Sequence, residues 1–186
     1  MSPLTRQALT VEYALLGFLR GGPLHGYELH RRLADPAGLG QVWGLKQAHL
    51  YGLLARLEAE GYLTSRQQAQ AARPARKLFR LTRSGKAAFL AWVQSPVASG
   101  REFRLDFLVK LYLAEREAPP LTAPLVERQR VALQNWLAAQ EAEAARAAPG
   151  SYAARVCQFR IGQTEAMLAW LDTCAVPGQP AAAPGL

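Results

Sequence analysis

With 186 residues, the chain is long enough to bury a sizeable core, in one domain or in two small ones. Its formal net charge of +8 lies in the first half, where residues 1–100 hold 13 Lys or Arg against 5 Asp or Glu, while residues 101–186 hold 9 of each; this imbalance favours a polyanionic partner (DNA, RNA or an anionic membrane) over a merely soluble basic protein. No apolar run is long enough to cross a bilayer and the N-terminus has no secretory signal, so we expect a cytoplasmic protein with no membrane partner.

Three short helices are predicted in the first sixty residues. The first follows Thr10, which can cap it, and ends at Gly21. The second covers about residues 27–34. The third has the clearest apolar stripe, formed by Leu50, Leu53, Leu54 and Leu57, and it ends at Gly61.

A β-hairpin is predicted next. Residues 62–66 and 77–82 have the alternation of strands, and the segment between them is polar and small. The descending side of that segment carries Arg73, Arg76 and Lys77. A segment with three cations and little apolar surface is poorly explained by core formation. We therefore interpret the hairpin as a wing that reaches toward phosphates.

Four helices are predicted after the hairpin. They run from Thr82 to Ser95, over about residues 101–116, from Thr122 to Pro149, and from Ser151, which caps the last one. In the last helix a seam with alternating spacings of four and three residues suits a helical hairpin or a coiled-coil partner. The seam consists of Tyr152, Val156, Phe159, Gln163, Ala166 and Trp170. Residues 175–186, nearly all Ala, Pro and Gly, are expected to form a disordered tail.

The order helix, helix, helix, strand, strand, helix is that of a winged helix-turn-helix. The predicted fold class is therefore mainly α (α+β), a winged helix-turn-helix followed by a helical C-terminal arm. Fold does not establish function, so the surfaces must carry the functional argument.

The side of the third helix opposite its leucines is predicted to face DNA. Its middle is Ala48, Gly52, Ala55 and Ala59, and its edges are Gln47, His49, Tyr51 and Arg56. Small residues let a helix backbone approach a partner closely, while longer polar side chains reach base edges or phosphates. Packing of the small residues on another helix is the alternative, and the cationic hairpin that follows favours DNA.

Three further candidates lie near helix starts. Lys46 and Gln47 stand at the end that enters the groove in helix-turn-helix docking, where Gln47 can pair with adenine and Lys46 with guanine or a phosphate. An ordinary solvated side chain is an equal alternative for both. Tyr27 can hydrogen-bond a phosphate, or be a partly buried aromatic.

Catalytic and metal signatures are lacking in the sequence. No nucleophile with a base, glycine-rich phosphate loop or carboxylate pair has a suggestive spacing, so we expect neither an enzyme nor a cofactor. His25 and His30 are five residues apart and cannot share one helical face, so we expect no metal site. Cys157 and Cys174 lie about five turns apart in one predicted helix; we expect reduced thiols, with a redox sensor as the less favoured alternative.

Four segments resemble the PadR-like transcriptional regulators, and the resemblance extends over about residues 9–114. They are residues 22–29 (GPLHGYEL), 50–63 (LYGLLARLEAEGYL), 76–85 (RKLFRLTRSG) and 101–112 (REFRLDFLVKLY). In this order and spacing they are specific. The sequence departs from the family at Lys46, where a serine often caps the helix, at Gly52, often proline, and at Phe79, usually tyrosine.

The resemblance implies a homodimer, clasped by its C-terminal helices, that binds a palindromic operator in double-stranded DNA. Most such proteins are repressors released by a small molecule, frequently aromatic or phenolic. We therefore expect a DNA-binding domain over residues 1–97, a helical dimerisation domain over 98–174 and the tail over 175–186. Aromatic residues for the effector or the dimer interface are Trp92, Trp136, Phe159 and Trp170, with plain core packing as the favoured alternative.

The predicted function is a sequence-specific transcriptional regulator that acts as a ligand-responsive repressor. Two alternatives remain open. A non-specific architectural DNA binder would bind without operator preference. A helical protein-interaction module would use the C-terminal hairpin and leave the basic half incidental.

Overall fold

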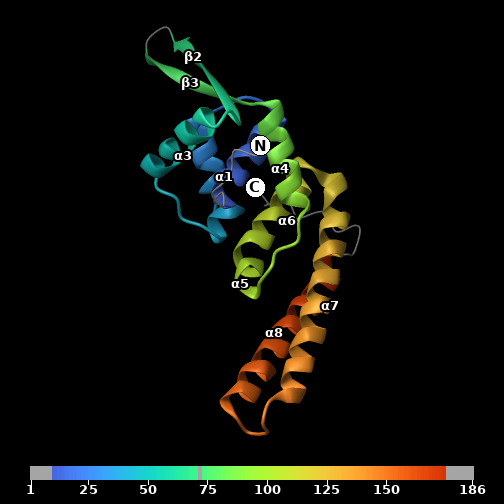
Figure 1. Cartoon of the computed structure of the whole chain (residues 1–186). Coiled ribbons are helices and arrows are strands. Elements are labelled where there is room, and N and C mark those ends of the chain that lie inside the picture. The colour runs from blue at the N-terminus through green and yellow to red at the C-terminus, as the bar shows by residue number, and fades with distance from the viewer. Residues whose placement is uncertain (1–9, 71–72, 175–186) are drawn as a thin grey trace, which may run out of the picture.

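The computed structural model describes residues 10–70 and 73–174 (Figure 1). The tail predicted over residues 175–186 lies outside the described residues. Of the helices in these two ranges, none is both long and apolar enough to cross a membrane.

The described elements follow the predicted order, and the mainly helical fold class is confirmed. The first half contains α1 (Thr10–Phe18), η1 (Leu19–Gly21), β1 (Leu24–His25), α2 (Gly26–Leu33), η2 (Leu39–Gln41), α3 (Gln47–Ala59), β2 (Leu63–Gln70), β3 (Arg73–Leu81) and α4 (Arg83–Gln94). The second half contains α5 (Gly100–Glu102), η3 (Phe103–Phe107), α6 (Leu108–Glu117), η4 (Pro119–Leu121), α7 (Thr122–Arg146) and α8 (Tyr152–Cys174). The helix predicted over residues 101–116 is divided, because the five residues of η3 form a π-helical turn between α5 and α6.

The sheet has three antiparallel strands in the order β1-β3-β2. β2 pairs with β3 from Leu63 opposite Leu81 to Gln70 opposite Arg73, so both strands are longer than predicted. The prediction was short because the outer part of the hairpin is polar on both faces, and its pairing depends on backbone hydrogen bonds. β1 was not predicted, since two residues are too few to show an alternation.

We call the part of the chain from α1 to α6 the body. Its core surrounds α1, which packs against α3, α4 and α6. Leu15 and the leucine stripe of α3 are almost completely buried, and each buried leucine contributes roughly 1.5–3 kcal/mol. Gly17 lets these helices approach closely, because a Cβ there would lie 2.8 Å from Phe89 Cε2 of α4. Thr10, predicted as a cap, is the first residue assigned to α1, and its hydroxyl donates to Asp106 Oδ1 at 2.5 Å.

Lys110 attaches the end of α4 to α6. Its Nζ donates to the Ser95 carbonyl at 2.7 Å and lies 5.1 Å from the centroid of the Trp92 ring. That ring stacks on Tyr13 of α1 at 4.9 Å between centroids. Burial lowers the pKa of Lys110 to about 8.

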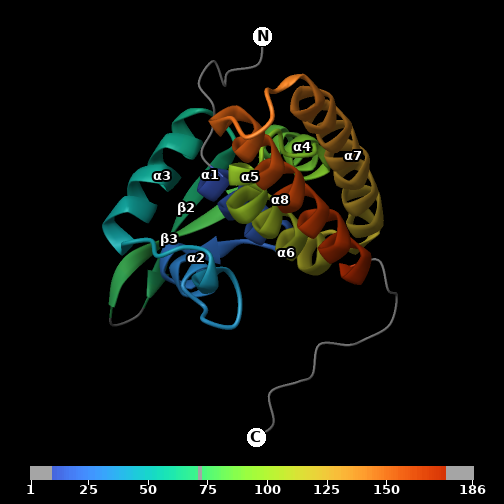
Figure 2. The same cartoon turned by 90° about the horizontal axis from the view of Figure 1, so that it is seen from below.

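α7 and α8 form a hairpin that extends away from the body (Figure 1), and α8 passes across α5 and α6 (Figure 2). The face of α8 toward α7 includes Cys157, Thr164 and Leu171, which are buried and seven residues apart. The Thr164 hydroxyl lies 3.0 Å from Gln140 Oε1 of α7, which can accept its proton. Ser151 accepts a hydrogen bond from the Ala154 N–H at 3.1 Å, which confirms the predicted cap.

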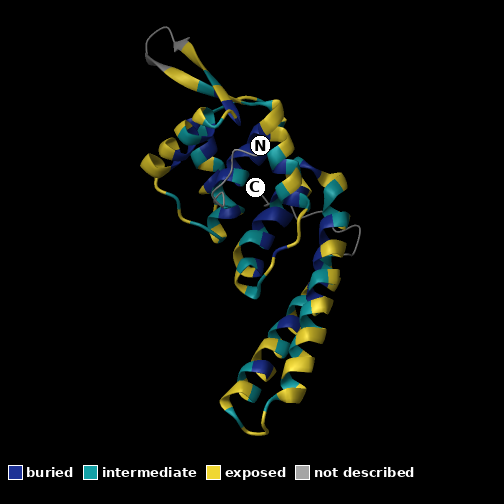
Figure 3. Cartoon of the chain, in the orientation of Figure 1, coloured by how far each residue is buried: buried dark blue, intermediate teal, exposed yellow. Residues whose placement is uncertain are grey.

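The aromatic seam predicted on α8 is not the face that closes this hairpin. Tyr152 is 82% exposed, Phe159 64% and Trp170 37%, so the seam is an outer face of the single chain. Figure 3 shows buried residues concentrated in the body, with the outer part of the hairpin mostly exposed or intermediate. Trp170 touches the body edge-on, 5.8 Å from Phe103 and 6.3 Å from Phe107 between centroids.

Candidate nucleic-acid interface

The outward face of α3 is open to solvent. The four leucines of the stripe are buried, and Ala48, Gly52, Ala55 and Ala59 on the opposite side are exposed. A Cβ at Gly52 would meet nothing within 4 Å. The small-residue face is therefore not packed on another helix of the described part of the chain.

The start of α3 exposes Lys46, Gln47 and His49 together. Lys46 is the N-cap residue in an extended conformation, and its side chain forms no cap hydrogen bond. The Lys46 carbonyl accepts hydrogen bonds from the N–H groups of His49 and Leu50, at 3.0 and 3.2 Å. The three polar side chains thus remain available at the helix end that enters a groove.

Two tyrosines border α3 on the side of α2. Tyr51 is exposed, yet its ring covers the start of α2 so closely that a Cβ at Gly26 would lie 2.6 Å from Tyr51 Cε1. Tyr27, the next residue of α2, is 60% exposed. Glycine at position 26 therefore lets the Tyr51 ring pack on the start of α2.

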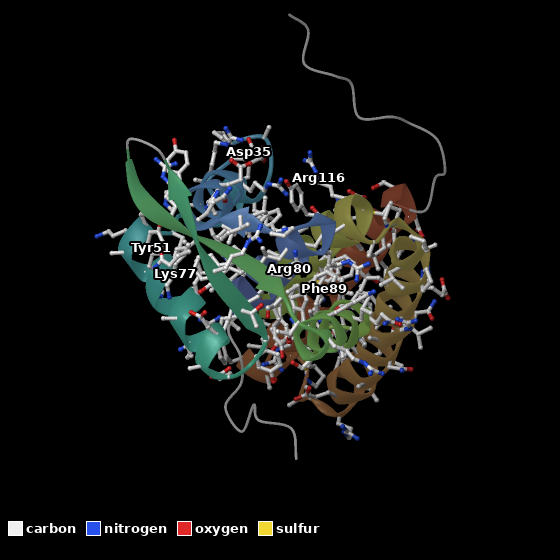
Figure 4. The ribbon with its side chains drawn as sticks, turned by 90° about the horizontal axis from the view of Figure 1, so that it is seen from above. Asp35, Tyr51, Lys77, Arg80, Phe89 and Arg116 are labelled. Atoms are coloured by element: carbon white, nitrogen blue, oxygen red, sulfur yellow. The ribbon has the colours of Figure 1, made fainter. Side chains whose placement is uncertain are left out.

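The hairpin is attached to α3 through Glu58. Lys77 Nζ of β3 lies 3.2 Å from Glu58 Oε2, and the Ser65 hydroxyl of β2 donates to Glu58 Oε1 at 2.5 Å. The hydrogen bond from Ser65, and then Lys77, holds the pKa of Glu58 below its usual value. His25 Nδ1 lies 3.1 Å from the Lys77 carbonyl, which joins β1 to the same point. Tyr51 and Lys77 consequently lie on the same side of the molecule (Figure 4).

The two faces of the hairpin carry different residues. Along β3 the side chains alternate, so Arg76 and Arg80 share the face away from α3, and Lys77 lies on the other. Arg66 stands opposite Leu78 and adds an exposed cation that the sequence analysis did not propose. Arg66 lies within the predicted strand over residues 62–66, so the alternation of that strand could have found it. The side chain of Arg73, a predicted contact, lies outside the described residues.

Arg56, like Lys77, is paired with an acid of its own chain, and its partner is the more buried of the two acids. Its guanidinium forms an ion pair with Glu12 of α1, a residue that is only 2% exposed. The side chain of Arg56 is itself 31% exposed. Its charge is thus directed to a buried carboxylate of its own chain, and we remove Arg56 from the candidate interface.

The predicted aromatic residues do not form one cluster. Trp92 contacts Tyr13 and Phe89 inside the body, whereas Trp170 contacts Phe103 and Phe107. Phe159 is exposed on the outer face of α8. Trp136 of α7 is half-buried beside a separate hollow. The expectation of a shared site is therefore corrected for Trp92, because its stacking partners belong to the core.

The histidines have structural neighbours. His30 Nε2 lies 2.9 Å from the Leu45 carbonyl and fastens the loop before α3 to α2. Within residues 10–70 and 73–174, no three side chains of His, Cys, Asp or Glu come together in a way that could hold a metal ion.

These features define a winged helix-turn-helix protein with a C-terminal helical hairpin, whose exposed α3 face and cationic hairpin are joined through Glu58. Residues 15–91 match the transcriptional regulator PadR-like family, and residues 103–176 match the virulence activator alpha C-terminal family. Residues 15–91 therefore carry a PadR-like domain, and the chain is similar to the PadR-like transcriptional regulators.

One relative is the negative transcriptional regulator PadR of Bacillus subtilis. It is 29% identical over 173 residues, which cover 88% of this chain and 94% of the relative. The crystal structure of B. subtilis PadR in complex with operator DNA is 24% identical, covers 90% of this chain and 97% of its own, and has a TM-score of 0.48. The structure of the same protein with p-coumaric acid is 23% identical, covers 89% and 96%, and has a TM-score of 0.43.

Proposed function

We propose that the protein is a sequence-specific regulator that binds double-stranded DNA through α3 and the hairpin. The observation that carries the proposal is the ion pair between Glu58 and Lys77, which holds the cationic hairpin beside the open face of α3. A helix with a small-residue face can enter a major groove, and a neighbouring cationic hairpin can follow the phosphates. The described side chains support a regulatory role rather than an enzymatic one.

The proposed contacts divide into two groups. Lys46, Gln47, His49 and Tyr51 would contact bases, because they surround the exposed start of α3. Tyr27, Arg73, Arg76 and Lys77 would contact phosphates at either side of the groove. Repression is the proposed outcome, supported by the similarity to PadR of B. subtilis, a negative transcriptional regulator.

We propose a homodimer that forms through the outer face of α8. The described residues of the chain leave Phe159 and part of Trp170 uncovered, and an exposed apolar patch of this kind marks an interaction surface. Phe159→Glu is expected to shift the protein to monomers in analytical ultracentrifugation, and Gln158→Glu, the same charge on a neighbouring exposed position, is not. Equal behaviour of the two variants would exclude this interface.

We also keep the division into a DNA-binding domain over residues 1–97 and a dimerisation domain over 98–174 as a proposal. α6 packs against α1, so the two domains would share part of one core. This shared packing offers a route by which the arm can influence the orientation of α3.

A small aromatic effector is proposed for the junction between η3 and α8. An apolar groove of about 600 Å³ there is lined by Phe103, Leu108, Met167 and Trp170. A hollow of about 380 Å³ beside it is lined by Trp136, with Arg101, Arg104 and Arg160 among its cations. Apolar walls with a few polar groups suit an aromatic acid. Titration with phenolic acids should quench tryptophan fluorescence, less so in Trp170→Phe, and unchanged fluorescence throughout would exclude the site.

The decisive experiment is selection of bound duplexes from a random DNA pool. The proposal expects enrichment of an inverted repeat, a changed preference in Gln47→Ala, and weaker binding to every sequence in Arg76→Glu. Salt-sensitive binding without enrichment would instead indicate an architectural binder. Absence of binding would leave the interaction module.

A further inference from the structure

A second basic hollow lies at the base of the hairpin, between η1, the end of β3 and the start of α4. Its volume is about 490 Å³. Its lining includes Leu19, Arg20, Arg80, Leu81, Arg83 and Lys86. Four of these six side chains are cationic, and they come from three different elements.

The four cations have little compensating charge: the Glu117 carboxylate acts on Arg20 without forming a salt bridge. Among the described residues, none of Arg20, Arg80, Arg83 and Lys86 forms an ion pair with an aspartate or glutamate, whereas Lys77 on the other face of β3 is paired with Glu58. Like charges around one concavity repel one another, and low-dielectric walls focus their field. The hollow is therefore a place where an anion would be stabilised.

Two of the cations stand where a helix disfavours them. Arg83 and Lys86 lie in the first turn of α4, which contains no acidic residue. The positive end of the helix dipole lies there, so a cation is destabilising and an anion stabilising. Thr82 accepts the Gly85 N–H at 3.0 Å, and the N–H groups of Arg83 and Ser84 have no intrahelical acceptor.

Arg20 is held in place and retains an unused donor. Its Nε donates to the Glu117 carbonyl at 3.0 Å, and its guanidinium lies 5.4 Å from the centroid of the Phe89 ring. Its Nη1 is buried and has no hydrogen-bond partner among the described residues. A buried donor without an acceptor is destabilising.

The hollow is distinct from the proposed operator interface. Figure 4 shows Tyr51 and Lys77 beside α3, while Arg80 lies on the side of the hairpin toward Phe89 and α4. The alternation along β3 also places Arg80 and Lys77 on opposite faces. A ligand can therefore occupy the hollow without competing for the α3 face.

We propose that this hollow binds a phosphate group through Arg20, Arg80, Arg83 and Lys86. Guanidinium groups and free N–H groups at a helix start are the donors that phosphate oxygens accept from. The phosphate can belong to the backbone of a duplex that continues past the operator, or to a free oligophosphate. The site does not depend on operator binding.

The first test uses tripolyphosphate as the probe in calorimetry at low salt. We expect saturable binding to the parent, at least tenfold weaker binding to Arg83→Glu/Lys86→Glu, and a change below twofold in Arg76→Glu on the outer hairpin. Arg83→Glu alone is expected to raise the ligand-free Tm, because a carboxylate complements the start of α4. A folded double variant that binds tripolyphosphate like the parent overturns a free-phosphate site.

The second test separates the two sources of phosphate. If the group belongs to DNA, lengthening the duplex beyond the selected operator strengthens binding by the parent and not by the double variant, while the short duplex binds both alike. If it is free, duplex length makes no difference and only tripolyphosphate binding changes. The proposal is overturned if the parent and the double variant bind tripolyphosphate equally and also respond equally to duplex length. A failure of operator selection leaves the tripolyphosphate result unaffected.

Discussion

Lys77 Nζ lies 3.2 Å from Glu58 Oε2, and this pair joins the hairpin to α3 across 19 residues of sequence. The side chains are 50% and 30% exposed, so the pair contributes only about 0.5–1 kcal/mol to the free energy of unfolding. Glu58→Gln is expected to cost about that much while weakening operator binding severalfold, because the hairpin is less firmly held. Urea denaturation and a mobility shift measure the two effects, with Glu141→Gln on α7 as control.

The same carboxylate predicts a pH dependence. The pKa of Glu58 lies below its usual value of 4.5, first because of the Ser65 hydrogen bond and then because of Lys77. A group with a lowered folded pKa stabilises the fold above its unfolded pKa and loses that contribution as the pH falls through the folded value. The difference in stability between parent and Glu58→Gln should therefore be constant near neutrality and shrink below about pH 4.5. A difference that grows with acidity would contradict this.

Arg56 is predicted to act on stability. Removal of its guanidinium in Arg56→Met takes a cation from the almost buried carboxylate of Glu12, and the cost should be about 3 kcal/mol, at the lower end for a buried pair because Arg56 is partly exposed. Arg76→Met, on the exposed hairpin, should change stability by less than about 0.5 kcal/mol. Parental stability of Arg56→Met together with lost DNA binding would restore Arg56 to the interface.

The burial of Lys110 leads us to predict that the free energy of unfolding increases with pH in mild alkali. Its folded pKa of about 8 is below the ordinary 10.5, because burial penalises the charged amine. Between these values the unfolded chain binds more protons than the native one, so the free energy of unfolding increases with pH, by up to about 1.4 kcal/mol per unit. The stability of the parent relative to Lys110→Met should therefore increase from pH 8 to pH 10, and a flat difference would show that the amine titrates normally.

Gly17 is predicted to tolerate no side chain. In Gly17→Ala the new Cβ would lie 2.8 Å from Phe89 Cε2 and 3.1 Å from Leu113 Cδ2, so we expect a loss of about 1–3 kcal/mol by overpacking. Gly52→Ala is the matched control, because its Cβ is free and alanine is the better helix former by about 0.5–1 kcal/mol. Thermal denaturation should move the two variants in opposite directions.

The sequence was most informative where one periodic pattern faces one core. The leucine stripe of α3 predicted both its buried face and its exposed face, because a helix of 13 residues repeats the pattern several times. β1 has two residues and no pattern, so only its pairing with β3 reveals it. The ion pair of Arg56 was not predicted because its partner Glu12 lies 44 residues away, and helical geometry carries no information about such a contact.

The helical hairpin of α7 and α8 shows a second limit of pattern analysis. Two faces of α8 have similar spacing, one with Phe159 and Trp170 and the other with Cys157, Thr164 and Leu171. The larger aromatic residues made the first face the natural choice for the closed side. The smaller face closes against α7 instead, because small side chains allow two helices to come nearer, and the identity of the neighbouring helix decides which face is used.

Thr164 gives the arm a defined alignment. Its buried hydroxyl lies 3.0 Å from Gln140 Oε1 of α7 and 3.0 Å from the Arg160 carbonyl of its own helix, so sliding α8 by one heptad along α7 would keep the second contact and remove the one that joins the two helices. We expect this contact to fix the register of α8 against α7 in every copy of the chain. Two chains that join through α7 and α8 would then present their α3 helices at a constant spacing along the duplex.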